Sequence, residues 1–200
     1  MTAQATDTFL HESQEFDITQ LSHETELFDP RLHGLSPSIN STGCWRGHVC
    51  HFTLNDNQLQ LKTLWTNHGH PYPGWTEKRL PLPLLNGVKA NERYDEDGFQ
   101  DFHGRYDELD LDLAYTGDIL ISTDIVDDDR SFVRGHRRPW HFPRTLRLDF
   151  RNGQLVGQQD LSEVFRVFDD RYCTDGDFYG EKRRNGLRYL RRHLGAHFKF

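Results

Sequence analysis

The sequence predicts a mainly β protein whose antiparallel hairpins form a sandwich or a half-open barrel, followed by a C-terminal amphipathic helix. Short segments of alternating apolar and polar residues recur along the chain, which is typical of half-buried strands. Connections rich in proline and glycine separate them: "NHGHPYPGW", "LPLPLLNG" and "RGHRRPWHFP". Helical spacing of apolar residues begins only near the C-terminus. Together these observations indicate a mainly antiparallel β domain.

The first hairpin is predicted from "GCWRGHVCHFTLN" and "QLQLKTLW", which flank Asp56-Asn57. This dipeptide has a composition that suits a tight two-residue turn. The register then places the apolar side chains on one face of the hairpin, in the pairs Leu54–Leu59, Phe52–Leu61 and Cys50–Thr63.

A second hairpin is predicted from "LRLDF" and "LVGQQ", with Asn152-Gly153 at the turn. Asn-Gly is the favoured pair for a type I′ turn, because both central residues need φ > 0. Aligned on their turns, the two hairpins share the offset apolar–x–x–x–Gln–Leu, which begins at Leu54 in the first and at Phe150 in the second. This shared pattern suggests a duplicated supersecondary unit.

A third hairpin is predicted from "LDLDLAYTGDILISTDI", with Thr116–Asp118 as a three-residue loop. Its apolar pairs are Tyr115–Ile119, Leu113–Ile121 and Leu109–Ile125. On the polar face Asp110 lies opposite Asp124, with Asp112 on the same face. Like charges that face each other across strands destabilise a sheet. We therefore expect a frayed ladder, a basic side chain or a hard cation at these carboxylates.

The two ends of the chain differ from its middle. Residues 1–40 are predicted to be an acidic N-terminal segment, with one or two short helices and a loop, that docks on the core. Residues 41–200 are predicted to be one β-rich domain ending in a basic helix at about residues 180–198. Its apolar stripe is broken at Gly195 and consists of Leu187, Leu190, Leu194 and Phe198. The helix either packs on the sheet or presents its arginines to an acidic partner.

Composition indicates a polar globular protein, with 35% apolar and 28% charged residues. Fourteen Phe, seven Tyr and four Trp supply core material. No apolar run is long enough to span a membrane, and the first residues lack a basic start and an apolar stretch. We therefore expect a cytoplasmic protein without a membrane partner. Three widely spread cysteines fit a reducing compartment better than a disulfide framework.

Charge is unevenly distributed around the net value of −7. Residues 1–30 hold seven acids and no Lys or Arg, and residues 93–129 hold thirteen acids against two arginines. From Tyr179 onward, seven Lys and Arg stand against a single acid, Glu181. An acidic body disfavours direct nucleic-acid binding and favours a basic partner.

Cys44, His48, Cys50 and His51 are the most obvious candidates for a metal or redox centre. On an extended strand the two cysteines lie roughly 20 Å apart, too far for a disulfide, and the two histidines point to opposite faces. The spacing also differs from that of structural zinc sites. We therefore assign Cys50 to the core and the stretch to a hairpin.

Two weaker metal candidates remain. His68 and His70 form an H-x-H pair that can share a metal when extended, and the carboxylates of Asp110, Asp112 and Asp124 can hold Ca²⁺ or Mg²⁺. An exposed loop and a solvated acidic face are the simpler interpretations. The sequence predicts no cofactor.

Common catalytic motifs are absent from the sequence, including a Gly-rich phosphate loop, a G-x-S-x-G elbow and an H-E-x-x-H helix. His103 with Asp101 and Asp107 can form a general base with an orienting acid, but many similar trios exist. A binding protein is therefore favoured over an enzyme.

Three motifs resemble those of an uncharacterised family of small bacterial β-rich proteins. They are Cys44-Trp45-Arg46-Gly47-His48 with the hairpin that follows, "AYTGDILI" and "FRNGQLV", and they span roughly residues 41–160. They are similar to that family's W-R-G strand, Y-T-G turn and closing N-G hairpin. The resemblance implies a compact, cytoplasmic bacterial protein rich in β-structure, and it implies no activity for any residue.

The favoured function is a non-catalytic protein-binding module with an acidic recognition surface at Asp127, Asp128 and Asp129. Its concrete form is a bacterial immunity-type inhibitor of a basic toxin. Charge complementarity and loops rich in aromatic residues and arginine suit such an interface. The alternative is a β-rich enzyme or small-ligand binder whose pocket is lined by Trp65, Trp75, Trp140 and His141.

Overall fold

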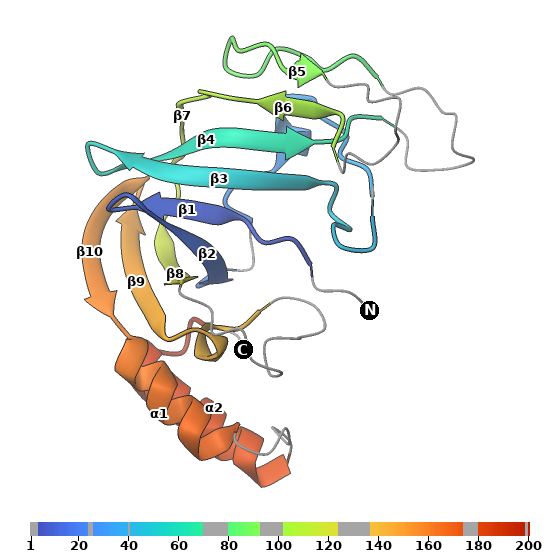
Figure 1. Ribbon diagram of the computed structural model, residues 1–200. Helices are drawn as coiled ribbons and strands as arrows, with labels where there is room; N and C mark the ends of the chain where they lie inside the picture. The colour runs from blue at the N-terminus through green and yellow to red at the C-terminus, as the bar shows by residue number, and fades with distance from the viewer. Residues whose placement is uncertain are drawn as a thin grey trace.

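The computed structural model describes residues 4–23, 26–39, 41–69, 80–92, 102–123, 137–173, 180–198 and 200. Within these residues, seven strands close into a barrel in the order β10-β9-β8-β2-β1-β3-β4, because β4 also pairs with β10 (Figure 1). Neighbouring barrel strands run antiparallel except β1 and β3, which are parallel. The predicted mainly β fold with a C-terminal helix is confirmed, and the barrel is closed.

The barrel strands are β1 (Thr8–His11), β2 (Gln14–Leu21), β3 (His48–Asn55), β4 (Gln58–Thr66), β8 (Gly117–Thr123), β9 (Arg144–Arg151) and β10 (Gln154–Asp160). Three short strands extend the sheet beside β4, namely β5 (Asn91–Glu92), β6 (Gly104–Tyr106) and β7 (Leu111–Asp112). Two short 3₁₀ helices are η1 (Pro30–His33) and η3 (Pro139–His141).

Large apolar side chains fill the barrel interior. Phe9, Phe52 and Leu148 are at most 1% exposed and belong to one continuous cluster. The ring centroids of Phe9 and Phe150 lie 6.5 Å apart. Small barrels are commonly filled by side chains in this way. The described interior is therefore a packed core, so any binding site has to lie outside it.

The first two predicted hairpins are confirmed. Asp56 and Asn57 have φ of 49° and 64°, and Asn152 and Gly153 have φ of 48° and 80°, as type I′ turns require. Leu54 pairs with Leu59, and Phe150 pairs with Leu155, as the sequence predicts.

The repeated Gln–Leu pattern of these hairpins lies where the barrel closes. The Leu59 amide donates to the Gly153 carbonyl at 2.8 Å, and the Leu155 amide donates to the Asn57 carbonyl at 2.9 Å. The Gln154 side chain donates to the Gln58 side-chain oxygen at 2.7 Å. Equivalent residues thus pair with each other, which gives the closure a local two-fold relation.

One predicted pair in the first hairpin is wrong. Cys50 lies opposite Leu64 instead of Thr63, because a bulge between His51 and Phe52 shifts the register by one residue. The strand also begins later than expected. Residues 43–47 form turns, and β3 starts at His48.

The predicted third hairpin is wrong. Strand β7 pairs with β4, with Asp112 opposite Gln60, whereas β8 pairs with β2 and β9. The Leu109 amide donates to the Lys62 carbonyl and the Leu113 amide to the Leu59 carbonyl, both at 3.0 Å. The chain therefore follows β4 before it crosses to β8, and the proposed strand pair does not form.

The prediction of helices within residues 1–40 is also wrong where β1 and β2 form. Residues 8–21 make the antiparallel pair β1–β2, which supplies two members of the barrel wall. The turn at Glu12 and Ser13 has φ of 50° and 65°. Among the described residues of this segment, only η1 is helical, and the Asp29 carboxylate caps it by accepting from the Arg31 amide.

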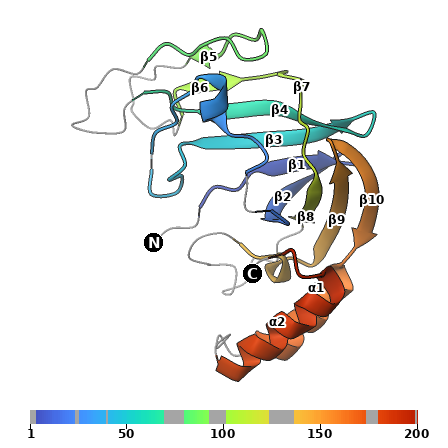
Figure 2. The same cartoon turned by 180° about the vertical axis from the view of Figure 1, so that it is seen from behind.

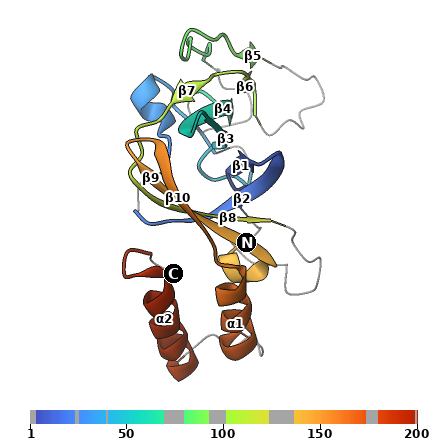
Figure 3. The ribbon, with the colours of Figure 1, turned by 90° about the vertical axis from the view of Figure 1, so that its left-hand side faces the viewer.

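Two helices follow the barrel and pack side by side, α1 (Ser162–Tyr172) and α2 (Gly180–Leu194) (Figure 3). The predicted C-terminal helix is confirmed, with its end just before Gly195 at φ 83°. A second apolar cluster joins the helices to the barrel through Leu120 of β8. The helix pair and strands β5–β6 lie at opposite ends of the molecule (Figures 1 and 2). None of the described helices is both long and apolar enough to cross a membrane.

Candidate functional site

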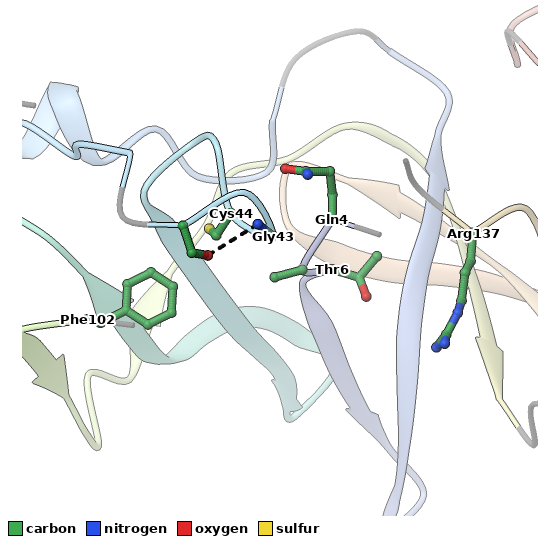
Figure 4. A pocket seen from close by; sticks show the side chains of 8 residues that line it. Gln4, Thr6, Gly43, Cys44, Phe102 and Arg137 are labelled. Atoms are coloured by element: carbon green, nitrogen blue, oxygen red, sulfur yellow. Dashed lines mark hydrogen bonds between the residues drawn. The ribbon is translucent and has the colours of Figure 1, made fainter. Parts of the chain in front are cut away.

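A cavity of about 390 Å³ lies at the end of the barrel where β1 and β3 begin. Chain segments that precede β1, β3, β6 and η3 form its walls (Figure 4). Its lining residues are Gln4, Ala5, Thr6, Ser41, Gly43, Cys44, Phe102 and Arg137. The volume falls within the usual range for small-molecule sites, which is roughly 300–1,000 Å³.

A paired arginine and aspartate fix the N-terminal wall of this cavity. The Arg46 guanidinium donates to both carboxylate oxygens of Asp7, at 2.7 and 2.6 Å. One of these oxygens also accepts from the Cys50 backbone amide at 2.7 Å. Bidentate pairs of this kind are directional as well as strong. The pair therefore holds the segment before β1 against β3.

Arg137 lies on the opposite side of the cavity from Phe102, with Thr6 and Cys44 between them (Figure 4). The Arg137 Nε atom is buried and has no hydrogen-bond partner among the described residues. Burial raises the pKa of the nearby Asp17 carboxyl, although the Arg137 charge and a hydrogen bond from Thr6 oppose this shift.

The three cysteines, of which only Cys44 lines the cavity, lack the lowered pKa of an activated nucleophile. Burial raises the pKa of the Cys44 thiol, which donates to the His48 carbonyl at 3.4 Å. Burial also raises the pKa of Cys50 well above its ordinary value, and it raises the pKa of Cys173 to about 12. All three thiols are free. A nucleophilic thiolate needs the opposite shift.

The residues predicted as metal ligands have structural partners where they are described. His68 Nδ1 accepts from the Ser36 amide at 2.9 Å. Asp110 accepts from Lys62 at 2.8 Å, and Asp112 accepts from the Gln60 side chain at 2.7 Å. His70 and Asp124 lie outside the described residues. Within the described part of the chain, no three or more His, Cys, Asp or Glu side chains gather in a way that could hold a metal ion.

The predicted aromatic pocket does not form from its described members. Trp65 contacts His51, and Arg105 lies over its ring at 4.9 Å on the β4–β6 side of the barrel. Trp140 packs on Phe168 at 4.8 Å between η3 and α1. His141 stands next to Trp140, where its Nδ1 accepts from the Arg138 amide. Trp65 therefore belongs to the β4–β6 part of the sheet and Trp140 to the helical cluster, and Trp75 lies outside the described residues.

Of the remaining predicted residues, some lie outside the described part of the chain and the others make separate contacts. Asp127, Asp128 and Asp129 fall outside the described residues, so the acidic recognition surface stays a prediction. His103 Nδ1 lies 3.2 Å from the Asn67 side-chain oxygen, whereas Asp107 binds Arg105 at 2.7 Å. The described part of the suggested acid–base trio is therefore divided between two separate contacts.

A second candidate surface is the outward face of α2. Five arginines on this helix are exposed, and none of them has an ion-pair partner among the described residues. Four of them, all except Arg183, follow one side of the helix; we call this set the arginine face, and it consists of Arg184, Arg188, Arg191 and Arg192. On α1, by contrast, Arg166 is paired with Glu163 at 2.6 Å and with Asp170 at 2.9 Å.

Sequence reasoning identified the basic helix but not the cavity. Its walls come from segments widely separated in the sequence, and only tertiary structure brings Phe102 and Arg137 to one site. The only signal in the sequence was the high content of aromatic residues and arginine in the connections, without an indication of which ones converge.

The comparisons provide no relative from which a function could be transferred. Neither a family model, nor a curated protein, nor a solved structure matches the chain.

Proposed function

We propose that this protein is a non-catalytic binding protein that recognises an acidic protein surface through the arginine face of α2. The observation that carries the proposal is the absence of ion-pair partners for the four exposed arginines of this face within the described residues. Arginine is well suited to such a role, because its planar guanidinium binds carboxylates in a bidentate manner.

Helix stability does not explain this charge pattern. Arg184, Arg188 and Arg192 follow one another at i,i+4 spacing, where like charges repel. Arg183 and Arg184 also lie near the helix N-terminus, where the helix dipole disfavours positive charge. These repulsions are relieved when an anionic partner covers the face.

The side of α2 that carries Leu190 and Leu194 anchors the helix. Leu190 and Leu194 are each 1% exposed in the cluster that includes Phe165 and Phe168 of α1. The arginine face is therefore presented on a supported helix, which lowers the entropy lost when a partner binds. The barrel then serves as the scaffold.

An acidic protein is favoured over nucleic acid because the rest of the chain is acidic. The net charge of −7 includes the basic helix, so the remaining surface is more negative still. A long polyanion would meet repulsion beyond the helix, whereas a compact acidic patch needs to match only α2, about 22 Å long.

The test measures binding of a fluorescent decaglutamate peptide at low salt. Replacing Arg184, Arg188 and Arg191 together by Gln should weaken binding by about tenfold or more. The matched control replaces three exposed cations elsewhere, Lys89, Arg151 and Arg171, by Gln, and it should bind nearly as the unaltered protein does. Added salt should weaken binding by the unaltered protein.

Three results would contradict the proposal. They are no saturable binding of the peptide, an equal loss in both triple variants, and tighter binding of a DNA duplex of matched length. The last result would identify the arginine face as a nucleic-acid site.

A further inference from the structure

We propose that the cavity at the start of β1 and β3 binds a small organic carboxylate, with the carboxylate at Arg137 and an apolar or aromatic group at Phe102. This site is separate from the arginine face and does not depend on the proposed function. The inference rests on the unsatisfied donor at Arg137, the space beside it and the chemistry of the walls.

Arg137 provides the recognition of charge. Its Nε atom is buried without a hydrogen-bond partner among the described residues, although buried donors in folded proteins are nearly always satisfied. Among the described residues, no hydrogen bond joins the Arg137 guanidinium to Asp17, although the Arg137 charge influences the pKa of that carboxyl. A bound carboxylate would accept from Nε and one terminal nitrogen together.

The other walls limit the kind of ligand. Phe102 supplies an aromatic ring at the far side from Arg137 (Figure 4). Thr6 and Ser41, which carry hydroxyl groups, also line the cavity. Ser41 Oγ accepts from the Gly43 amide at 3.2 Å and keeps its own proton to donate. An apolar group can therefore stack on Phe102 while the acid group faces Arg137.

The site is also preorganised on one side. The Gln4 side chain donates to the Thr42 carbonyl at 2.8 Å and accepts from the Trp45 amide at 3.1 Å. With the Asp7–Arg46 pair, these bonds hold residues 4–7 against residues 42–46 without a ligand. A fixed wall reduces the ordering needed when a ligand enters.

The experiment titrates 3-phenylpropanoate into the 200-residue chain and follows both the heat of binding and the backbone amide resonances. Saturable binding is expected, with shifts at Thr6, Gly43 and Cys44. Neutral 3-phenylpropanamide, which has the same shape without the charge, should bind with an affinity lower by about tenfold or more.

The matched variants are Arg137→Met and Arg138→Met. Arg138 is the next residue in the chain but binds Gln20 at 3.4 Å and does not line the cavity. R137M should lose about tenfold or more in affinity, and R138M should bind as the unaltered protein does. F102A should weaken the binding of 3-phenylpropanoate and leave the binding of acetate unchanged. Circular dichroism and thermal unfolding confirm that each variant is folded.

The proposal is overturned if 3-phenylpropanoate does not bind saturably or if the amide binds equally well. Equal losses in R137M and R138M, or resonance shifts confined to α2, would overturn it too. None of these results bears on decaglutamate binding, so this proposal and the proposed function fail independently.

Discussion

His48, the first residue of β3, is a buried titratable side chain. The ring is 3% exposed, and its Nδ1–H donates to the Arg46 carbonyl at 3.1 Å. Its other nitrogen lies 3.7 Å from a carboxylate oxygen of Glu26 and is buried without a hydrogen bond among the described residues. Burial lowers the pKa of His48 below the usual 6.5, and the nearby Arg46 charge adds to this shift. The native fold therefore favours the neutral ring.

This shift predicts that His48 weakens the fold in acid. Below about pH 6.5 the unfolded chain binds a proton at His48 that the folded chain does not, so stability falls as the pH decreases, by at most about 1.4 kcal/mol per pH unit for this group. Urea unfolding between pH 7 and pH 5 should show a shallower loss for H48Q than for the unaltered protein. The exposed control H33Q should keep the original slope. Parallel slopes for H48Q and the unaltered protein would refute this assignment.

Single residues were the least predictable level of the structure. The sequence correctly assigned Cys50 to the core, because alternation along a strand is a local property. It could not show that Trp65 and Trp140 lie apart or that Asp110 binds Lys62. Such contacts depend on which strands become neighbours, and strand order is not encoded within any one segment.

At the scale of elements, local turn chemistry decided which predictions were correct. Asp56-Asn57 and Asn152-Gly153 favour positive φ, so both hairpins could be read directly. The β1–β2 turn uses Glu12-Ser13, residues that do not favour that conformation, and was therefore missed. Helix α1 was missed as well, although Asp160 accepts from the Ser162 amide at 2.8 Å at its start. Phe165 and Phe168 then follow at helical spacing.

Gly153 tests the junction of the two hairpins. It has φ of 80°, and a Cβ atom there would overlap the backbone carbonyl of Leu113. Gly34 has nearly the same φ, 79°, but open space around the position of its Cβ. G153A and G34A therefore share the strain of positive φ, and only G153A adds overlap. We expect G153A to lower the free energy of unfolding by about 1–3 kcal/mol more than G34A in urea titrations. Equal losses of unfolding free energy in G153A and G34A would show that the two hairpins can move apart enough to accept the added methyl group.

At the scale of the whole molecule, the two faces of β8 connect two cores. Ile119 and Ile121 face the barrel interior, and Leu120 between them faces the helices. On the same outer side as Leu120, Asp118 binds Arg147 at 3.0 Å and His197 at 2.8 Å. The chain that follows α2 thus returns to the barrel. This alternation allows a small barrel to carry a separate helical layer.

Leu120 should therefore control whether the helices stay docked on the barrel. The side chain is fully buried, and replacing it by Ala should cost about 2–5 kcal/mol. Because the helical cluster is separate from the barrel core, we expect L120A to accelerate hydrogen exchange mainly in α1 and α2. The control I121A removes an equally buried side chain from the adjacent position and should accelerate exchange throughout, since the helices have no support once the barrel opens. The same exchange pattern in both variants would mean that barrel and helices unfold as one unit. A loss below about 1 kcal/mol in L120A would mean that Leu120 does not hold the helices on the barrel.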